Sequence, residues 1–293
     1  MRQFDTRVEA YNDGIPDAVV DQYLKARRKR LRNQVLLVWT LRILLFAILL
    51  SAWQFVAEEN ILSPVFVGEP SRIFSDFLHL FQTTIVTTDL GTTLFETGVG
   101  FIVSIIVGVL VAYWIDRSRI IELVLRPLIT ASNSVPRIAL VPIFIIWFGL
   151  GPLSKIANVV AFVSFTVLMG SISAFKSTDR DSMLLARALG FSEYQRMRKF
   201  VIPGSIPALA DLLELALIYS FLGSVTAEML GGIHGLGVQL EALSNQFKTN
   251  EYFAVLLLIV IVVVVAVRAM QLLKSRILKW HVVEMRGEHR TVL

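Results

Sequence analysis

Several ionisable residues stand inside long apolar stretches of the sequence, where a charge is costly, and four of them are candidate polar sites. Glu96, Glu214 and Glu228 are acidic, and Arg137 is basic. A charged side chain at the centre of a bilayer costs on the order of 3 kcal/mol on insertion scales, so such groups usually face protein or water. We therefore expect these four residues to be polar sites inside a membrane-spanning bundle.

Three acidic residues fall on one side of a single predicted helix. Asp211, Glu214 and Glu228 lie within an arc of about 100° if each residue advances by about 100°. This arc could line a translocation path or pair with Arg137. A buried ion pair or hydrogen-bonded group is an equal alternative for Glu228, and Asp211 could simply be solvated. The acidic residues outnumber Arg137, so the sequence gives no support to an anion-attracting pore.

Signatures of catalysis and metal binding are absent from the sequence. There is no G-x-x-x-x-G-K-[ST] to cradle a nucleotide phosphate, no H-E-x-x-H and no G-x-S-x-G. The chain has no cysteine, and its four histidines are far apart in sequence. We predict no catalytic residue, no metal site and no cofactor in this chain. Any ATP and magnesium must be bound by a partner.

The composition indicates an integral membrane protein. Hydrophobic residues make up 55% of the 293 residues, mean hydropathy is +0.67, and charged residues are only 17%. A soluble domain usually carries about 25% charged residues. So much apolar surface cannot be hidden in one soluble core of this size, and the excess must face lipid.

Six apolar stretches are long enough to cross a bilayer as helices. The sequence therefore predicts an all-α membrane bundle of six transmembrane helices. Pro127, Pro136 and Pro142 should kink or break the third stretch. The predicted spans are residues 35–57, 91–115, 123–148, 156–175, 206–230 and 252–273.

Lysine and arginine counts predict the orientation. With the N-terminus in the cytoplasm, 22 of these residues face inward and three face outward. Both termini are then cytoplasmic, and the net charge of +5 needs no nucleic-acid partner. The predicted parts are a cytoplasmic extension (1–34), the first span (35–57), a periplasmic segment with an amphipathic helix from Pro70 (58–90), a core (91–273) and a cytoplasmic tail (274–293).

Small residues recur every fourth position along the second span. This spacing places them on one helix face and lets a neighbouring helix approach closely. We expect the face to be buried, which would also keep Glu96 away from lipid. The residues are Gly100, Ser104, Gly108 and Ala112.

The longest predicted cytoplasmic loop, residues 176–207, is rich in helix-forming residues around one glycine. It reads Ala186-Arg187-Ala188-Leu189-Gly190, then nine residues, then Phe200-Val201-Ile202-Pro203. The physical reading is a short helix, a glycine turn and a second helix interrupted at a proline. The plain alternative is an ordinary amphipathic loop.

This loop resembles the EAA loop of binding-protein-dependent ABC importer permeases, which couples a cytoplasmic ATPase to the spans. The resemblance assigns coupling roles to Ala186, Arg187, Ala188, Gly190, Ile202 and Pro203. The sequence departs from the pattern where Leu184 replaces the acidic residue and Leu185 the first alanine. Docking could therefore depend more on apolar contact or on nearby charged residues.

Other motifs resemble the nitrate/sulfonate/taurine branch of the same permeases. They include Ile61–Pro64, the third span from Arg126 to Gly151, Ala227–Leu230 and Gly235–Gly237. The resemblance covers roughly residues 60–280 and implies a type I fold in the bacterial inner membrane. It also implies a second permease copy in a homodimer, two ABC ATPase subunits, a periplasmic solute-binding protein and contact with membrane lipid. ATP-driven import of a small solute by alternating access is the function implied.

Two other classes of protein remain possible from the residues alone. An ion-gradient-driven secondary carrier or channel would use Glu96, Glu214 and Glu228 as proton or sodium sites. It would not need the loop at 176–207. An intramembrane enzyme would need a nucleophile or metal constellation, which the sequence lacks.

Overall fold

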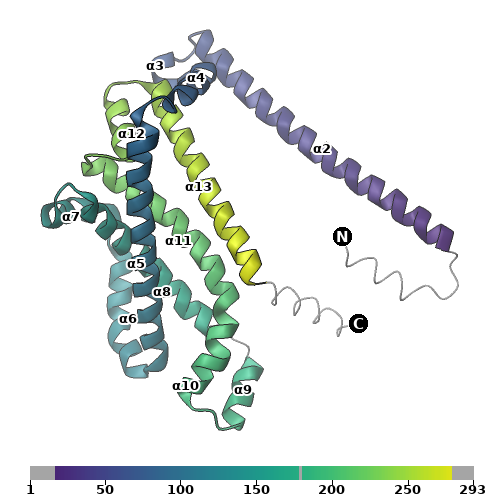
Figure 1. Cartoon of the computed structure of the whole chain (residues 1–293), viewed down its shortest axis with the longest axis vertical. Coiled ribbons are helices and arrows are strands. Elements are labelled where there is room, and N and C mark those ends of the chain that lie inside the picture. The colour runs from purple at the N-terminus through teal and green to yellow at the C-terminus, as the bar shows by residue number, and fades with distance from the viewer. Residues whose placement is uncertain (1–16, 178–179, 279–293) are drawn as a thin grey trace. The chain divides into compact units, whose positions relative to one another are not determined.

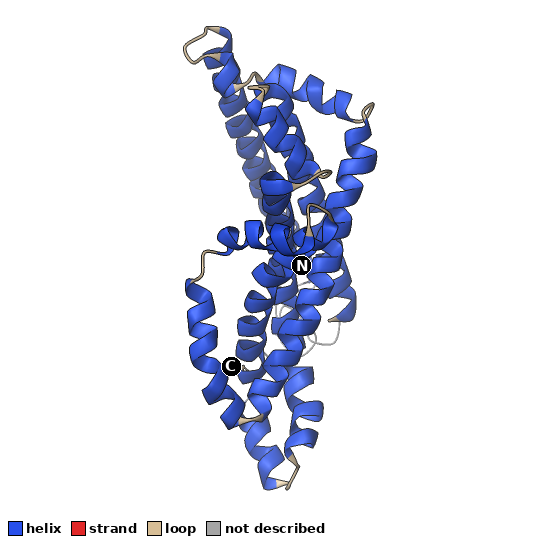
Figure 2. Cartoon of the chain, turned by 90° about the vertical axis from the view of Figure 1, so that its left-hand side faces the viewer, coloured by secondary structure: helices blue, strands red, loops and turns tan. Residues whose placement is uncertain are grey.

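The protein is helical throughout the part that a computed structural model describes, which is residues 17–177 and 180–278 (Figure 2). No strand occurs in these ranges. The chain divides into two compact units, Met1–Pro70 and Ser71–Leu293. The expected all-α class is confirmed.

The first unit is dominated by one long helix, α2 (Asp17–Glu58), at the purple end of the colour scale in Figure 1. Its 42 residues would extend about 63 Å at about 1.5 Å per residue, roughly twice the hydrocarbon core of a bilayer. The predicted first span, 35–57, is the C-terminal half of this helix. A short helix, α3 (Pro64–Val67), follows and ends at Gly68, whose φ of 72° suits glycine.

The second unit contains the other four long helices and their connections. Its long helices are α5 (Leu90–Arg117), α8 (Pro152–Lys176), α11 (Ile202–Gly231) and α13 (Thr249–Ile277). The shorter elements are α4 (Pro70–Leu80), η1 (Ile85–Asp89), α6 (Arg119–Ser134), η2 (Arg137–Leu140), α7 (Val141–Phe148), α9 (Arg180–Ala188), α10 (Glu193–Arg196), η3 (Met197–Val201) and α12 (Leu236–Asn245).

Among the described residues, five helical stretches are long and apolar enough to span a membrane, and the predicted third span is not among them. Residues 123–148 fold as α6, the 3₁₀ turn η2 and α7 rather than as one helix. Pro136 precedes η2, and Pro142 lies in the first turn of α7, where its missing N–H is tolerated. Pro127, in contrast, lies inside a continuous α6.

Helix α8 packs between α5 and α11 at the centre of the second unit. The small residues at positions 100, 104, 108 and 112 are all buried on α5. A β-carbon on Gly100 would lie 2.5 Å from Val159 Cγ1, and one on Gly108 would lie 2.7 Å from Val167 Cβ. The backbone of α5 therefore approaches the α8 side chains more closely than any larger residue would permit.

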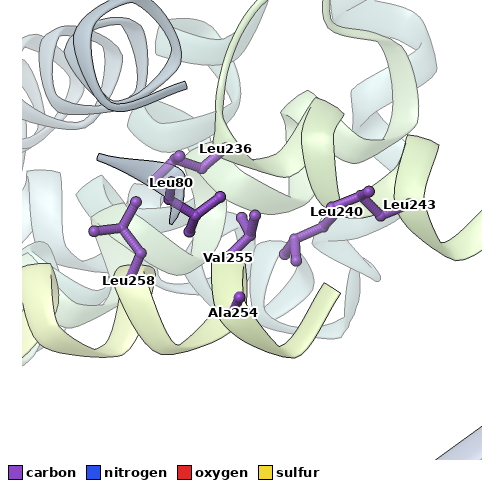
Figure 3. Close-up of a cluster of buried hydrophobic side chains, with 7 residues drawn as sticks. All are labelled: Leu80, Leu236, Leu240, Leu243, Ala254, Val255 and Leu258. Carbon is purple, nitrogen blue, oxygen red and sulfur yellow. The ribbon is translucent and has the colours of Figure 1, made fainter. Parts of the chain in front are cut away.

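A second apolar core joins α4, α12 and α13 (Figure 3). Ala254, Val255 and Leu258 lie along one side of α13 and face leucines of α12, while Leu80 from the end of α4 packs among them. The opposite side of α4 exposes Phe74 and Leu78. The segment after Pro70, which was expected to be amphipathic, thus buries one side in this core and exposes apolar side chains on its other side.

The close packing of α5 against α8 predicts that substitutions at two neighbouring glycines change the stability of the protein in opposite directions. Gly100→Ala should destabilise the protein, because the new methyl group must displace Val159; overpacking typically costs about 1–3 kcal/mol. Gly98→Ala is the matched control, since a β-carbon there meets nothing within 4 Å and alanine favours a helix. Thermal unfolding of the purified protein in one detergent measures both. Equal midpoints for the two variants would contradict the packing account.

Candidate functional site

The first turn of α12 is held by polar side chains of the segment that begins α5. The Gly235 N–H donates to Asp89 Oδ1 at 3.0 Å, and the Leu236 N–H donates to Thr93 Oγ1 at 2.9 Å. The Gln239 side chain also donates to Asp89 Oδ2 at 2.9 Å. Helix N-termini present unpaired N–H groups and partial positive charge, so a buried carboxylate stabilises this end of α12.

Glu228 of α11 supplies a further acceptor to the same turn. Its Oε2 accepts the Gly237 N–H at 2.7 Å, and its Oε1 lies 3.4 Å from the Ser224 hydroxyl. The Ser224 hydroxyl also lies 3.4 Å from Glu96 Oε2 on α5, so the two buried glutamates share a neighbour. Gly235 has a φ of 128°, and a β-carbon there would collide with the Glu228 carboxyl group.

Lys155 is the buried cation next to these carboxyl groups. It lies in the first turn of α8 and is 1% exposed. Its ammonium group donates to the carbonyl of Gly231, the last residue of α11, at 2.6 Å, and also to the carbonyl of Leu150. Lys155 attracts both Glu96 and Glu228 electrostatically. It thereby fixes the end of α11 and offsets the buried acidic charge.

We refer to Asp89, Thr93, Glu96, Lys155, Ser224 and Glu228 as the buried polar cluster. All six side chains are buried, and they come from η1, α5, α8 and α11. Two motifs that are separate in the sequence, Ala227–Leu230 and Gly235–Gly237, meet at this cluster. The arrangement holds α12 and the ends of three spans, α5, α8 and α11, together.

Arg137 does not pair with the acidic residues of α11. Its guanidinium group donates to the Phe162 carbonyl at 2.7 Å and lies 3.4 Å from Thr166 Oγ1. It also lies over the rings of Phe162 and Phe165, with centroid distances of 5.1 and 5.4 Å. The suggested pairing of Arg137 with this arc is therefore wrong, because the break at η2 directs Arg137 to the middle of α8.

Glu214 is paired at a different place on α11 from Glu228. Its carboxylate accepts from Gln271 at 3.0 Å and from the Lys274 ammonium group at 3.3 Å, both on α13. The exposed Asp211 also pairs with Lys274. The three acids that share an arc of α11 thus belong to two separate polar groups, one toward each end of the helix.

The loop between α8 and α11 folds as two short helices joined at Gly190. Gly190 has a φ of 72°, and the Phe191 N–H donates to the Ala186 carbonyl at 3.1 Å, which closes the end of α9. Ser192 and Gln195 then form a reciprocal capping box at the start of α10. The expected helix–turn–helix arrangement is present.

The two sides of this loop differ in burial. Ala186, Met197 and Val201 are buried, and the last two pack against Ala112 and Ile115 of α5. Leu184, Leu185, Leu189 and Tyr194 are each more than half exposed, and Ala188 and Ile202 are also exposed. Pro203 is half-buried, while the side chain of Arg187 and residues 178–179 lie outside the described part.

Lys155, Asp89, Thr93 and Ser224 are the cluster residues that the sequence did not indicate. Lys155 follows a Gly-Pro pair at the end of an apolar stretch, which is also where a solvated loop lysine would stand. Its acceptor on Gly231 is 76 positions away. The available signal was the helix-start pattern of Gly151 and Pro152, which extends α8 over Lys155.

The chain belongs to the family described as "Binding-protein-dependent transport system inner membrane component", which matches residues 104–279, more than half of the chain. This range contains α8, the loop around Gly190, α11 and α12. The protein is thus the membrane-embedded permease component of an ABC import system.

Curated relatives are similar over most of their length. The chain is 26% identical to the putative aliphatic sulfonates transport permease SsuC of Bacillus subtilis, covering 83% of this chain and 88% of that protein. It is 28% identical to the formylaminopyrimidine transport permease ThiX of Halalkalibacterium halodurans, covering 81% and 94%. It is 25% identical to the taurine transport permease TauC of Escherichia coli, covering 90% and 98%.

Solved structures support the same fold. A permease-length chain of the MetNI methionine ABC transporter matches with a TM-score of 0.55 at 19% identity, covering 65% of this chain and 93% of that chain. A chain of an amino acid ABC transporter matches with a TM-score of 0.53 at 21% identity, covering 69% and 96%. The ABC importer permease fold predicted from the sequence is confirmed.

The buried polar cluster predicts that Lys155→Met destabilises the protein. The variant leaves the Gly231 and Leu150 carbonyls without this donor and leaves Glu96 and Glu228 without their nearby cation. Each buried polar group left unsatisfied costs about 1–3 kcal/mol, so the midpoint of thermal unfolding should fall by several degrees.

The matched control is Lys248→Met, because the Lys248 side chain is 49% exposed and pairs only at the surface with Glu251. Such pairs contribute about 0–1 kcal/mol. Adding Glu96→Gln to Lys155→Met should restore part of the lost stability, because it removes one of the two acidic groups that share Ser224. A Lys155→Met protein as stable as the Lys248→Met control would show that the cluster does not hold the helices together.

Proposed function

We propose that this chain forms half of the translocation path of an ATP-driven importer and that a second copy of the chain forms the other half. A cytoplasmic ABC ATPase binds ATP and magnesium and docks on the α9–α10 loop. A periplasmic solute-binding protein delivers the solute to the opposite face. The path opens alternately to the two sides, and this chain carries out no covalent chemistry.

The observation that carries this proposal is the connection of the loop to α11. α10, η3 and α11 form one uninterrupted helical stretch from Glu193 to Gly231. At η3 the Ile202 N–H donates to the Met197 carbonyl five residues back, directly before Pro203, which has no N–H to donate. A force applied to α10 would therefore act on a full-length span rather than on a slack linker.

The exposed side of the loop supports docking of a partner by apolar contact. Leu184 and Leu185 of α9, Leu189 directly after it and Tyr194 of α10 are 53–64% exposed, although the opposite side of the same loop is packed against α5. Leu184 and Leu185 are also the positions that depart from the EAA pattern. An ATPase groove with an apolar floor would match this surface.

The orientation follows from the charge distribution along the chain. Basic residues concentrate on the N-terminal half of α2, around the junction of α5 and α6, around α9–α10, and at the end of α13 and beyond it. We therefore assign both termini and the α9–α10 loop to the cytoplasm. The buried polar cluster, α12 and residues 58–90 then face the periplasm, where the solute-binding protein would dock.

The solute class follows from the relatives. Proteins similar to this chain are named for aliphatic sulfonates, formylaminopyrimidine and taurine, which are all small organic solutes. We propose a small organic solute for this chain as well, with the choice among them made largely by the solute-binding protein. Arg137 donates to the Phe162 carbonyl and lies over two aromatic rings, so we assign it a structural role and no solute contact.

An ion-driven carrier is less well supported. Such a carrier needs acidic residues that are available to bind an ion. Glu228 is instead engaged by the Gly237 N–H, Glu96 and Glu228 lie beside Lys155, and Glu214 is paired with Lys274. Structural contacts therefore account for all three acids.

The coupling role predicts different outcomes for two substitutions at Gly190. Gly190→Arg should abolish solute uptake by the assembled transporter while the protein still inserts. A β-carbon at this position meets nothing within 4 Å, so the damage arises from the positive φ and from bulk on the docking surface. Gly190→Asn is the control, because asparagine tolerates this backbone region and adds little bulk.

Uptake of labelled solute and ATP hydrolysis are measured together in membranes that contain all subunits. We expect Gly190→Arg to retain less than about a tenth of wild-type uptake and Gly190→Asn to retain most of it. The magnitude follows the general rule that shifting functional groups by about 1 Å lowers a rate by a large factor, because here the arginine would shift the helices that dock on the ATPase. Wild-type uptake by a normally expressed Gly190→Arg variant would exclude the loop from coupling.

A further inference from the structure

Helix α2 continues without a break from an apolar segment into a strongly basic one. Val35–Phe55 is apolar apart from Thr40, Arg42, Ser51 and Gln54, whereas Lys25, Arg27, Arg28, Lys29, Arg30 and Arg32 precede it on the same helix. No residue of the 17–58 range departs from helical structure. The basic residues therefore lie at fixed distances along the helix axis from the apolar segment.

These distances along the helix axis match the position of the polar head-group layer of a bilayer. The 21 residues from Val35 to Phe55 extend about 31 Å, which equals the thickness of a typical hydrocarbon core. Lys29 and Arg32 then lie about 9 and 5 Å before the start of this core. That distance places both at the level of the lipid phosphates and well within a Debye length of the membrane surface.

Two residues inside the apolar segment support the same position. The Arg42 guanidinium carbon lies 5.5 Å from the centroid of the Trp39 ring, and Trp39 stands one turn closer to the basic end. Arg42 is thus directed back along the helix, as expected for a cation reaching toward the interface. Tryptophan is itself enriched at that level.

The basic residues also surround the helix instead of forming one stripe. At about 100° per residue, the six positions leave no gap wider than about 100°. Lys29, Arg30 and Arg32 are each exposed. A protein partner would contact one side of the helix, whereas a layer of head groups contacts all sides. The distribution of charge therefore favours lipid over a protein groove.

We propose that these basic residues form a collar around α2, in which Lys29, Arg30 and Arg32 bind the phosphate groups of anionic phospholipids in the leaflet on the N-terminal side of α2. Lys25 and Arg27 add to the positive potential of the collar. The occupants are phosphatidylglycerol or cardiolipin, because their head groups carry phosphate charge that no cation of their own neutralises. This binding is separate from solute transport and from the ATPase docking surface.

Lipid binding to the full-length chain, purified in mild detergent with its co-purifying subunits, tests the proposal. Native mass spectrometry counts the bound lipids as cardiolipin or the zwitterionic phosphatidylcholine is added. The test variant carries Lys29→Gln, Arg30→Gln and Arg32→Gln together. The matched control carries Lys29→Arg, Arg30→Lys and Arg32→Lys, which keeps every charge.

We expect the glutamine variant to bind cardiolipin roughly tenfold more weakly than the wild type, since each basic residue near the surface contributes to the attraction. The charge-keeping control should bind as the wild type does, and the wild type should bind phosphatidylcholine much more weakly. Arg27 and the basic cytoplasmic loops remain in both variants, and a protease-accessible C-terminal tag verifies that insertion is unchanged.

Three results would overturn the proposal. The first is equal cardiolipin binding by the wild type and the glutamine variant. The second is equal affinity of the wild type for cardiolipin and phosphatidylcholine. The third is loss of a co-purifying acidic protein from the glutamine variant with lipid binding unchanged, which would assign the collar to a protein partner.

Discussion

The close approach of α5 to α8 is the constraint on which the second unit depends. Lipid tails are as apolar as leucine, so helices in a bilayer associate through packing and polar contacts rather than through a hydrophobic driving force. Gly100 and Gly108 allow that packing, because any β-carbon there would overlap Val159 or Val167. Helix α11 packs against both α8 and α5, and α12 and α13 are built onto this three-helix group.

The buried polar cluster performs the complementary task at one end of the same helices. Its carboxyl groups accept the backbone N–H groups at the start of α12, and Lys155 donates to the carbonyl that ends α11. Each helix terminus thus meets a side chain of opposite charge. Polar groups that would be costly in lipid are satisfied inside the protein, and they define how α12 meets the spans.

Much of this architecture could be predicted from the sequence because the signals are local. Apolar length revealed the spans, Pro136 and Pro142 indicated the break in the third one, and four-residue spacing identified the buried face of α5. The turn at Gly190 was likewise visible. The contacts of Lys155 and Arg137 could not be predicted, because both side chains donate to backbone carbonyls. Every residue has a carbonyl, so charge counting suggested a carboxylate partner for Arg137 and none for Lys155.

The account rests on the claim that a separate ATPase drives this chain through the α9–α10 loop. The most direct measurement is to isolate the tagged chain from its native membranes in mild detergent and to identify the co-purifying proteins by mass spectrometry. We predict a P-loop ATPase in stoichiometric amount with this chain. Isolation of this chain alone, in a form that still transports solute into liposomes without ATP, would contradict the account.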